Sequence, residues 1–201
     1  LTAAFANGFA SNADENGNGA TKNKIENKVV FLGRATTPCV AFCAKRFGAS
    51  VTASHNPPEY AGLKPFRDRR CFYGEDLSQL QSYYSKEENS ASNAAIATAA
   101  KKARKLKEDE DAKRAYVDSL PEFENGVYDL GGGAACAFAS LFPKTIFAEP
   151  DPLFAKRSPE PKDETLGALK AETLKRRCLG FAFDGDADRV AAVDSGRTID
   201  S

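Results

Sequence analysis

Apolar runs and polar turns alternate along this chain with the rhythm of an α/β protein. In the first half, residues 29–32 and 50–52 are predicted strands. Residues 37–46 between them form a predicted helix, with Thr37 as its cap and Pro38 at its first helical position. A strand, a helix and a strand in so few residues predict a βαβ unit, in which the two strands run parallel.

The same pattern predicts the elements of the remaining segments. Residues 1–9 form a predicted helix, residues 11–28 a loop, and residues 75–88 an amphipathic helix. Further strands are predicted at 127–130, 144–148, 179–183 and 190–193, and further helices at 134–142 and 164–177. In the last of these helices we expect three leucines to share one buried face: Leu166, Leu169 and Leu174.

A dense run of charges separates the two halves. Residues 101–114 carry charges of both signs, which favours a solvated helix or linker over a basic arm. We therefore expect two α/β domains, residues 1–108 and residues 109–201. Each should be a mixed or parallel sheet in an α-β-α arrangement, and the first should be incomplete.

Composition narrows the possible partners and the compartment. Lys and Arg number 28, as do Asp and Glu, and a zero net charge argues against a general nucleic-acid or anionic-membrane binder. No apolar run approaches the roughly 20 residues that span a bilayer. Five cysteines without a CxxC pair favour a reducing, cytoplasmic location over a disulfide framework or a zinc site. Because the chain contains no Met, we expect a processed product or a fragment.

One stretch, residues 52–64, offers a hydroxyl at the end of a strand. It reads Thr-Ala-Ser-His-Asn-Pro-Pro-Glu-Tyr-Ala-Gly-Leu-Lys, and its Asn-Pro-Pro run ends regular structure and exposes Ser54 on a loop. A hydrolytic serine needs a histidine base within hydrogen-bond reach. The only histidine is His55, and neighbouring side chains on an extended backbone diverge. We therefore do not expect a hydrolase triad.

A second stretch, residues 184–189, offers three carboxylates at alternating positions. Asp184, Asp186 and Asp188 would repel one another unless a cation or a change in protonation relieves the charge. Carboxylate oxygens favour Mg²⁺ or Ca²⁺. An EF-hand loop is excluded, because the places for its Gly and Glu hold Arg189 and Ser195. A divalent ion held here would suit phosphate transfer at Ser54.

These two stretches resemble the active-site serine loop and the metal loop of the α-D-phosphohexomutases, the family of phosphoglucomutases, phosphomannomutases and phosphoglucosamine mutases. The matching segments read TASHNPPEYAGLK and FDGDADR. Weaker matches occur in the same order at residues 36–38, at Asp129 with the Gly-rich turn, and at residues 158–161. The resemblance covers nearly the whole chain and implies an N-terminal fragment with the fold of that family's first two domains.

The resemblance implies a mechanism and a set of site residues. Ser54 would be carried as phosphoserine and exchange its phosphate with hexose phosphates through a hexose 1,6-bisphosphate. Three aspartates and the Ser54 phosphate would hold Mg²⁺: Asp184, Asp186 and Asp188. Lys64 would act as an acid, a base or a charge-stabilising group, and His55 and Arg189 would support the phosphate. The resemblance leaves open whether the hexose is glucose, mannose or glucosamine.

The chain also departs from the family pattern. Ala61 stands where the family has Asn before the loop glycine, and Cys178 where it usually has Asp. The family's first strand, with its phosphate-contacting Arg, and its third and fourth domains lie outside these 201 residues. We therefore expect phosphate chemistry but not sugar orientation from this segment alone. Two alternatives remain: a non-catalytic remnant that binds sugar phosphate, and a nucleotide-binding module built on the turn 131–133.

Overall fold

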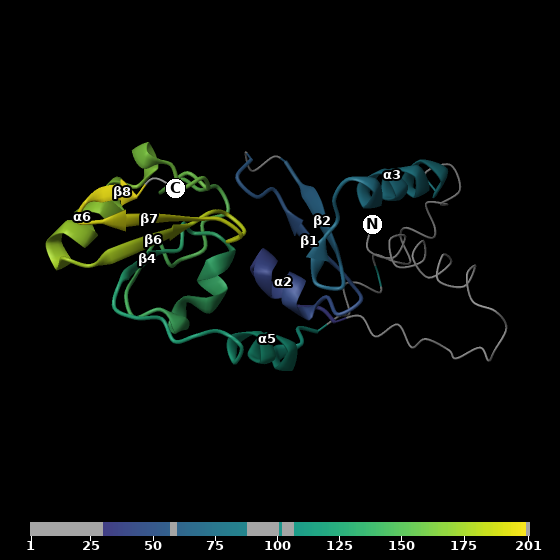
Figure 1. The fold of residues 1–201 in the computed structure, drawn as a ribbon, viewed down its shortest axis with the longest axis horizontal. Helices are drawn as coiled ribbons and strands as arrows, with labels where there is room; N and C mark the ends of the chain where they lie inside the picture. The colour runs from purple at the N-terminus through teal and green to yellow at the C-terminus, as the bar shows by residue number, and fades with distance from the viewer. Residues whose placement is uncertain (1–29, 57–59, 88–100, 102–106, 200–201) are drawn as a thin grey trace. The chain divides into compact units, whose positions relative to one another are not determined.

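The computed structural model describes residues 30–56, 60–87, 101 and 107–199 (Figure 1). Contacts divide the chain into two compact units, one made of residues 1–31 and 72–109, the other of residues 32–71 and 110–201. The helix predicted at 1–9 and the loop predicted at 11–28 lie outside the described residues. None of the described helices is both long and apolar enough to cross a membrane.

The smaller unit contains the helix α3, Glu75–Glu87. It begins with Glu75 and Asp76, whose charges suit the positive end of the helix dipole. Its bounds agree with the predicted helix at 75–88. The unit also contains one parallel bridge, between Phe31 and Glu108, where the sequence predicted a strand at 29–32. That strand is therefore reduced to a single bridge in the part of it that is described.

The larger unit begins with the helix α2, Thr37–Cys43, and a small sheet. Thr36 caps α2, one residue earlier than predicted, and its hydroxyl accepts a hydrogen bond from the Cys39 amide at 3.3 Å. Three strands follow in the order β1-β2-β3 and pair antiparallel. Their bounds are Phe47–Thr52, Gly62–Arg67 and Arg70–Cys71.

The antiparallel pairing corrects the predicted βαβ unit. The chain leaves β1 at Thr52 and returns at Gly62, which lies opposite Thr52 in the ladder. A connection this short can join only antiparallel neighbours, whereas parallel strands need a longer crossover. The prediction was wrong because it paired β1 with the run before α2 rather than with the residues after the serine loop.

A five-stranded mixed sheet follows in the same unit, with the order β5-β4-β6-β7-β8. β4 pairs parallel with β5 and β6, while β6–β7 and β7–β8 are antiparallel hairpin pairs. The bounds of β4 to β8 are Val127–Asp129, Thr145–Ile146, Leu179–Phe183, Val190–Asp194 and Arg197–Ile199. Four of these strands were predicted, and the three-residue β8 was not.

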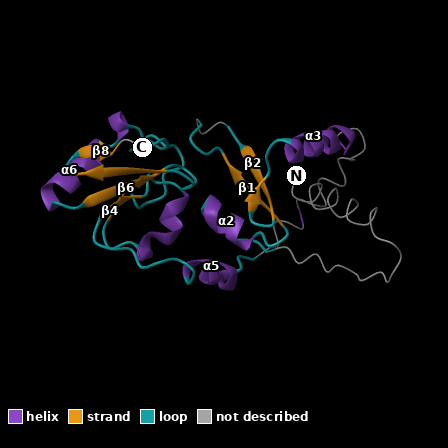
Figure 2. Cartoon of the chain, viewed as in Figure 1, coloured by secondary structure: helices purple, strands orange, loops and turns teal. Residues whose placement is uncertain are grey.

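The bounds of the further described helical segments are α5 Glu110–Val117, η1 Ala134–Leu141, η2 Asp163–Thr165 and α6 Gly167–Arg176 (Figure 2). α6 packs on β4, β6 and β7, whereas α5 packs on α2. The predicted helix at 134–142 is instead a 3₁₀ helix interrupted at Phe138. In α6, Leu169 and Thr173 are fully buried, whereas Leu174 is 64% exposed, so the predicted three-leucine face is wrong at its last member.

Two packing contacts hold the serine-bearing segment to the rest of the larger unit. The side chains of Leu32, Cys39 and Phe138 form one buried cluster, which joins α2 to η1. The Tyr116 ring of α5 lies 5.6 Å from Phe42 and 5.7 Å from Phe138, centroid to centroid. α2 is therefore fixed beside η1, and the strand that carries the serine follows directly from it.

Candidate active site

Ser54 sits just after β1, where the strand gives way to the loop, as the sequence predicted. Its φ is 55°, in the left-handed region that non-glycine residues rarely adopt. The Ser54 amide donates to the Thr52 hydroxyl at 2.7 Å, and the Asn56 amide donates to the Ala53 carbonyl at 3.0 Å. These turn contacts hold the serine in a conformation that an extended strand would not give.

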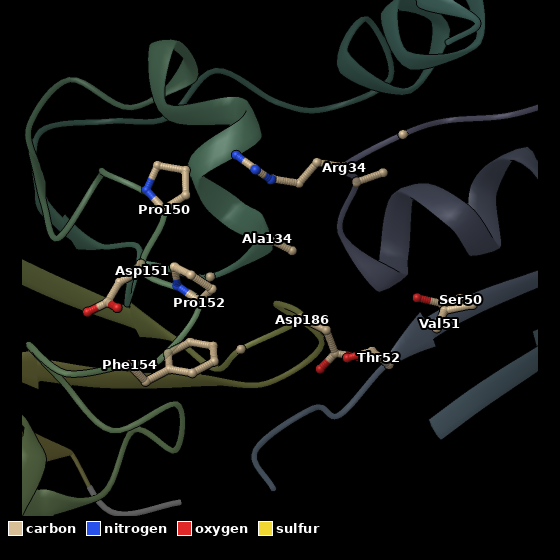
Figure 3. Close-up of a pocket in the computed structure, with 15 residues that line it drawn as sticks. Arg34, Ser50, Val51, Thr52, Ala134, Pro150, Asp151, Pro152, Phe154 and Asp186 are labelled. Carbon is tan, nitrogen blue, oxygen red and sulfur yellow. The ribbon is translucent and has the colours of Figure 1, made fainter. Parts of the chain in front are cut away.

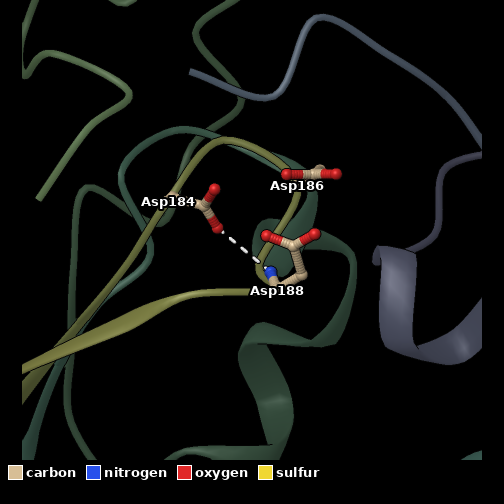
Figure 4. A group of neighbouring side chains, drawn as sticks. All are labelled: Asp184, Asp186 and Asp188. Carbon is tan, nitrogen blue, oxygen red and sulfur yellow. Dashed lines mark hydrogen bonds between the residues drawn. The ribbon is translucent and has the colours of Figure 1, made fainter. Parts of the chain in front are cut away.

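The three aspartates follow β6 in a tight turn (Figure 4). One Asp184 oxygen, Oδ1, accepts hydrogen bonds from the amides of Asp188 at 3.0 Å and Arg189 at 3.1 Å. Ala187, with φ 59°, lets the chain turn so closely. One oxygen from each of Asp184, Asp186 and Asp188 lies within 4.8 Å of the others. The turn therefore gathers three carboxylates on one side.

The structure brings the serine loop and the aspartate loop together, although 130 residues separate Ser54 from Asp184. The Ser54 hydroxyl lies 3.5 Å from Asp184 Oδ2. Gly185 allows this approach, because a Cβ at that position would lie 2.2 Å from the Ser54 carbonyl oxygen. The backbones of the two loops thus touch, and the contact excludes any side chain at residue 185.

Lys64 on β2 lies between the two loops. Its Nζ donates to Asp188 Oδ2 at 2.6 Å and to Asp186 Oδ2 at 2.8 Å, and it is 3.5 Å from the Ser54 hydroxyl. Burial works against the charged form, but the hydrogen bonds to Asp186 and Asp188 prevail and raise the pKa of Lys64. Lys64 is therefore an ammonium at neutral pH, which suits a proton donor or a counter-charge better than a base.

His55 and Arg189 flank the site on its exposed side. Contrary to the divergence expected for neighbours, His55 Nδ1 lies 3.4 Å from the Ser54 hydroxyl. The expectation failed because it assumed extended backbone, and Ser54 is left-handed. Arg189 Nε donates to Asp184 Oδ2 at 3.1 Å, and its Nη1 reaches Glu160 Oε1 at 3.5 Å. Both side chains therefore offer hydrogen-bond donors or charge close to the serine.

The charges of the aspartates are unevenly satisfied. Burial and the nearby Asp186 and Asp188 raise the pKa of Asp184 against the hydrogen bonds from Arg189. Burial acts in the same direction on Asp186, but hydrogen bonds from Lys64 and Thr37 outweigh it and lower the pKa of Asp186. The other Asp186 oxygen, Oδ1, is buried, and no residue that the structure describes gives it a hydrogen bond. Three carboxylates thus face two cationic side chains, Lys64 and Arg189.

This donor set fits a hard divalent cation. Buried polar atoms normally find a partner, and no described residue gives a hydrogen bond to Asp129 Oδ2 or to Asp186 Oδ1. Of these two oxygens, that of Asp186 belongs to the carboxylate cluster and is free to take a cation. Carboxylate oxygens are the ligands that Mg²⁺ prefers. Asp184, Asp186 and Asp188, together with an oxygen on Ser54, are the groups that would hold such an ion.

Two contacts at the site were missed by the sequence reasoning. The Thr37 hydroxyl donates to Asp186 Oδ2 at 2.6 Å, and the Thr37 amide donates to the Asp186 carbonyl at 2.9 Å. The sequence predicts a helix start at residues 36–38 and matches them to the family pattern, but neither indicates a partner 149 residues away. Ser50 of β1 lies 3.2 Å from the same hydroxyl and was treated as an ordinary strand residue.

The second missed contact is a buried ion pair below the aspartate loop. Arg157 Nε donates to Asp129 Oδ1 at 2.9 Å, and both side chains are almost fully buried. The same guanidinium donates to the carbonyl of Phe183, directly before Asp184. Gly131 leaves room for it, since a Cβ there would lie 2.4 Å from Arg157 Nη2. Arg157 had no signal in the sequence beyond its place in a Pro-rich loop.

The Gly-rich turn after β4 does not resemble a nucleotide site in its hydrogen bonding. Four successive amides of the turn all donate to groups of the protein. The Gly131 amide donates to Asp129 Oδ1, Gly132 to the Phe147 carbonyl, Gly133 to the Leu130 carbonyl and Ala134 to the Gly185 carbonyl. A dinucleotide-binding turn presents such amides to a pyrophosphate. The glycines here pack the turn against the aspartate loop instead.

A cavity of about 330 Å³ borders the site (Figure 3). Its wall includes Asp186 and Thr52 on one side and Arg34 and Pro150 on another. Ser54 is not among the described residues that line it.

Sequence models of one family match both halves of the chain. The model described as phosphoglucomutase/phosphomannomutase α/β/α domain I matches residues 9–91, and that for domain II matches residues 123–197. Together they span well over half of the chain. The chain belongs to the phosphoglucomutase/phosphomannomutase family, which confirms the resemblance and the expected α/β fold.

Individual relatives agree with this assignment. The phosphoglucosamine mutase of Natranaerobius thermophilus is 33% identical over 181 residues, covering 83% of this chain and 40% of the relative. That of Methanococcus vannielii is 32% identical over 194 residues, covering 86% and 42%. The solved structure of a phosphoglucomutase/phosphomannomutase family protein from Burkholderia thailandensis is 25% identical with a TM-score of 0.64, covering 86% and 41%. The chain thus spans about two fifths of the length of the curated relatives it matches.

Proposed function

We propose that this chain is the phosphate-transfer half of a Mg²⁺-dependent phosphohexomutase, which interconverts hexose 6-phosphate and hexose 1-phosphate through a phosphoserine and a hexose 1,6-bisphosphate. The observation that carries the proposal is the meeting of Ser54 with three carboxylates, one of which has a bare buried oxygen. His55 Nδ1 lies 3.4 Å from the hydroxyl, but no part of a hydrolytic triad accounts for the three carboxylates that lie beside it among the described residues. A hydroxyl beside such a cluster suits the transfer of a phosphoryl group whose charge a divalent ion offsets.

The side chains around Ser54 have separate roles in this proposal. The Ser54 Oγ attacks the phosphorus of the bisphosphate, and the bond from phosphorus to the sugar oxygen breaks. The Ser54 hydroxyl gives up its proton and the sugar oxygen takes one up. The Lys64 ammonium, 3.5 Å from that Oγ, balances the charge of the transfer or supplies the proton that the sugar oxygen takes up. His55 and Arg189 bind the phosphate oxygens from the exposed side. Mg²⁺, when bound by the aspartates, polarises the phosphoryl group.

The hexose to test first is suggested by the names of the relatives rather than by the site. Both curated relatives described above are named phosphoglucosamine mutases. We therefore extend the proposal to a hexosamine phosphate as the first substrate to test, with glucose and mannose phosphates as the comparison. We expect no nucleic-acid or membrane partner.

The domain boundary and the compartment belong to the same proposal. We place one domain at residues 1–108 and the next at 109–201, on the charge pattern of the sequence. We propose a cytoplasmic location, because each of the five cysteines keeps its thiol rather than forming a disulfide.

Transfer of labelled phosphate to the protein tests the proposal. The donor is hexose 1,6-bisphosphate, with and without Mg²⁺, and the control is Ser54→Ala. We expect label that requires both Mg²⁺ and Ser54. If no label appears on a protein that still binds sugar phosphate, the chain is a non-catalytic binding remnant. Label that persists in Ser54→Ala would refute the assigned nucleophile.

A further inference from the structure

Two buried hydroxyls connect the serine-bearing segment to Asp186. Thr37 on α2 is 5% exposed, Ser50 on β1 is 7% exposed and Asp186 is 3% exposed. Their polar atoms form a chain, with 3.2 Å from the Ser50 hydroxyl to the Thr37 hydroxyl and 2.6 Å from there to Asp186 Oδ2. At this depth each hydrogen bond is shielded from water, so the direction of each proton matters.

The chemistry of the three groups fixes that direction. An ionised carboxylate only accepts hydrogen bonds, and a hydroxyl has a single proton to give. The short contact of 2.6 Å therefore uses the Thr37 proton, and Ser50 must donate to the Thr37 oxygen. The result is a relay that runs from Ser50 through Thr37 to Asp186, with both hydroxyls polarised toward the carboxylate.

The relay acts on one oxygen of Asp186 and leaves the other bare. Oδ2 receives the Thr37 hydroxyl and the Lys64 ammonium, whereas Oδ1 is buried without a partner. Thr37 also holds the Asp186 carbonyl through its own amide at 2.9 Å. The amide bond fixes the backbone of Asp186 beside Thr37, and the hydroxyl bond disfavours a rotation of the carboxylate that would exchange its two oxygens.

We propose that the Ser50–Thr37 hydroxyl relay positions Asp186 so that Oδ1 is the oxygen offered to the divalent cation, and that it thereby sets the affinity of the site for Mg²⁺. Thr37 and Ser50 are positioning residues, since they act only through Asp186. The inference rests on the proposed Mg²⁺ site. Groups that orient metal ligands in this way typically change metal affinity by 10- to 100-fold when they are removed.

Calorimetric titration of the intact protein with Mg²⁺ tests the relay, without any sugar or turnover. Thr37→Val removes the hydroxyl at nearly constant shape and should weaken Mg²⁺ binding by about 10- to 100-fold. Thr37→Ser keeps the hydroxyl and should restore binding to within about threefold of the wild type. Thr36→Val is the matched control, because it alters the same helix start without touching Asp186, and its Mg²⁺ affinity should equal that of the wild type.

A second variant keeps the test valid if Thr37→Val does not fold. Ser50→Ala removes the far end of the relay and should weaken Mg²⁺ binding by roughly two- to tenfold, the value of one hydrogen bond. Melting in the presence of EDTA shows whether each variant is folded before metal is added.

The outcomes separate the relay from the metal site itself. If the wild type binds Mg²⁺ and both Thr37→Val and Ser50→Ala bind equally well, the relay is refuted and the metal site stands. The relay also fails if Thr37→Ser binds as weakly as Thr37→Val. Asp188→Asn is the control for the metal site and should abolish the heat of Mg²⁺ binding. If the wild type shows no heat of Mg²⁺ binding, or if Asp188→Asn leaves that heat unchanged, the proposed metal site and the relay are both refuted.

Discussion

Gly185 is the residue at which one added methyl group should separate the two loops of the site. A Cβ there would lie 2.2 Å from the Ser54 carbonyl oxygen, and real Cβ contacts are essentially never shorter than 3.0 Å. The loops must therefore move apart by at least about 0.8 Å in Gly185→Ala. The φ of Gly185 is not in the left-handed region, so the alanine itself fits its backbone and the clash is the only cause of change.

The expected size follows from this displacement. A misplacement of about 1 Å at a reacting group costs about 100-fold in rate, so we expect phosphate transfer to Ser54 to slow about 100-fold. Overpacking of this kind also costs about 1–3 kcal/mol of folding stability. For a chain of this size that corresponds to a melting temperature lower by roughly 2–12 °C.

The assay is the rate of labelling from hexose 1,6-bisphosphate with saturating Mg²⁺, together with a melting curve. Gly167→Ala is the matched control, because nothing lies within 4 Å of its Cβ position and it begins helix α6. That variant should label at the wild-type rate and gain up to about 1 kcal/mol of stability. A Gly185→Ala protein that labels within twofold of the wild type and melts at the same temperature would refute the backbone contact.

Three further predictions concern the scaffold. Arg157→Met should lower the free energy of unfolding, measured in urea, by about 3–5 kcal/mol, because it leaves the Asp129 charge buried and unpaired. Adding Asp129→Asn should recover part of that loss, and no recovery would mean that the ion pair is not its cause. Leu169→Ala should cost about 2–5 kcal/mol by opening a cavity under α6, and a cost below 1 kcal/mol would contradict its full burial. Burial raises the pKa of the Cys39 thiol to about 12. Iodoacetamide at pH 8.5 should therefore alkylate the exposed Cys71 and leave Cys39 unmodified until the protein unfolds. Peptide mass spectrometry that finds both cysteines modified at similar rates would contradict this.

The sequence predicted best those features that depend on a few neighbouring residues. Strand β6 has the predicted bounds, because a buried apolar run followed by a cluster of aspartates leaves no alternative. The end of β1 before Ser54 followed in the same way from the Asn-Pro-Pro turn. The three aspartates could be expected to lie together, because their alternating spacing in one turn is itself the signal.

Features that depend on distant partners could not be read in this way. The pairing of β1 with β2 was missed, because strand period alone does not say which neighbour a strand takes. Thr173 rather than Leu174 faces the sheet, where its methyl group lies against Gly180. The role of Thr37 depends on a carboxylate 149 residues away, and no local pattern encodes that distance.

That separation also has a consequence for synthesis. Lys64 leaves the ribosome 124 residues before Asp188, its partner in the finished site. At roughly 5–20 residues per second, the first half of the site waits roughly 6 to 25 seconds for the second. During that time the groups of the site that face solvent are hydroxyls and the Lys64 ammonium, which water solvates readily. The half-made site itself therefore presents groups that water solvates, whereas the apolar side chains of Leu32 and Cys39 on the same segment stay uncovered until Phe138 emerges.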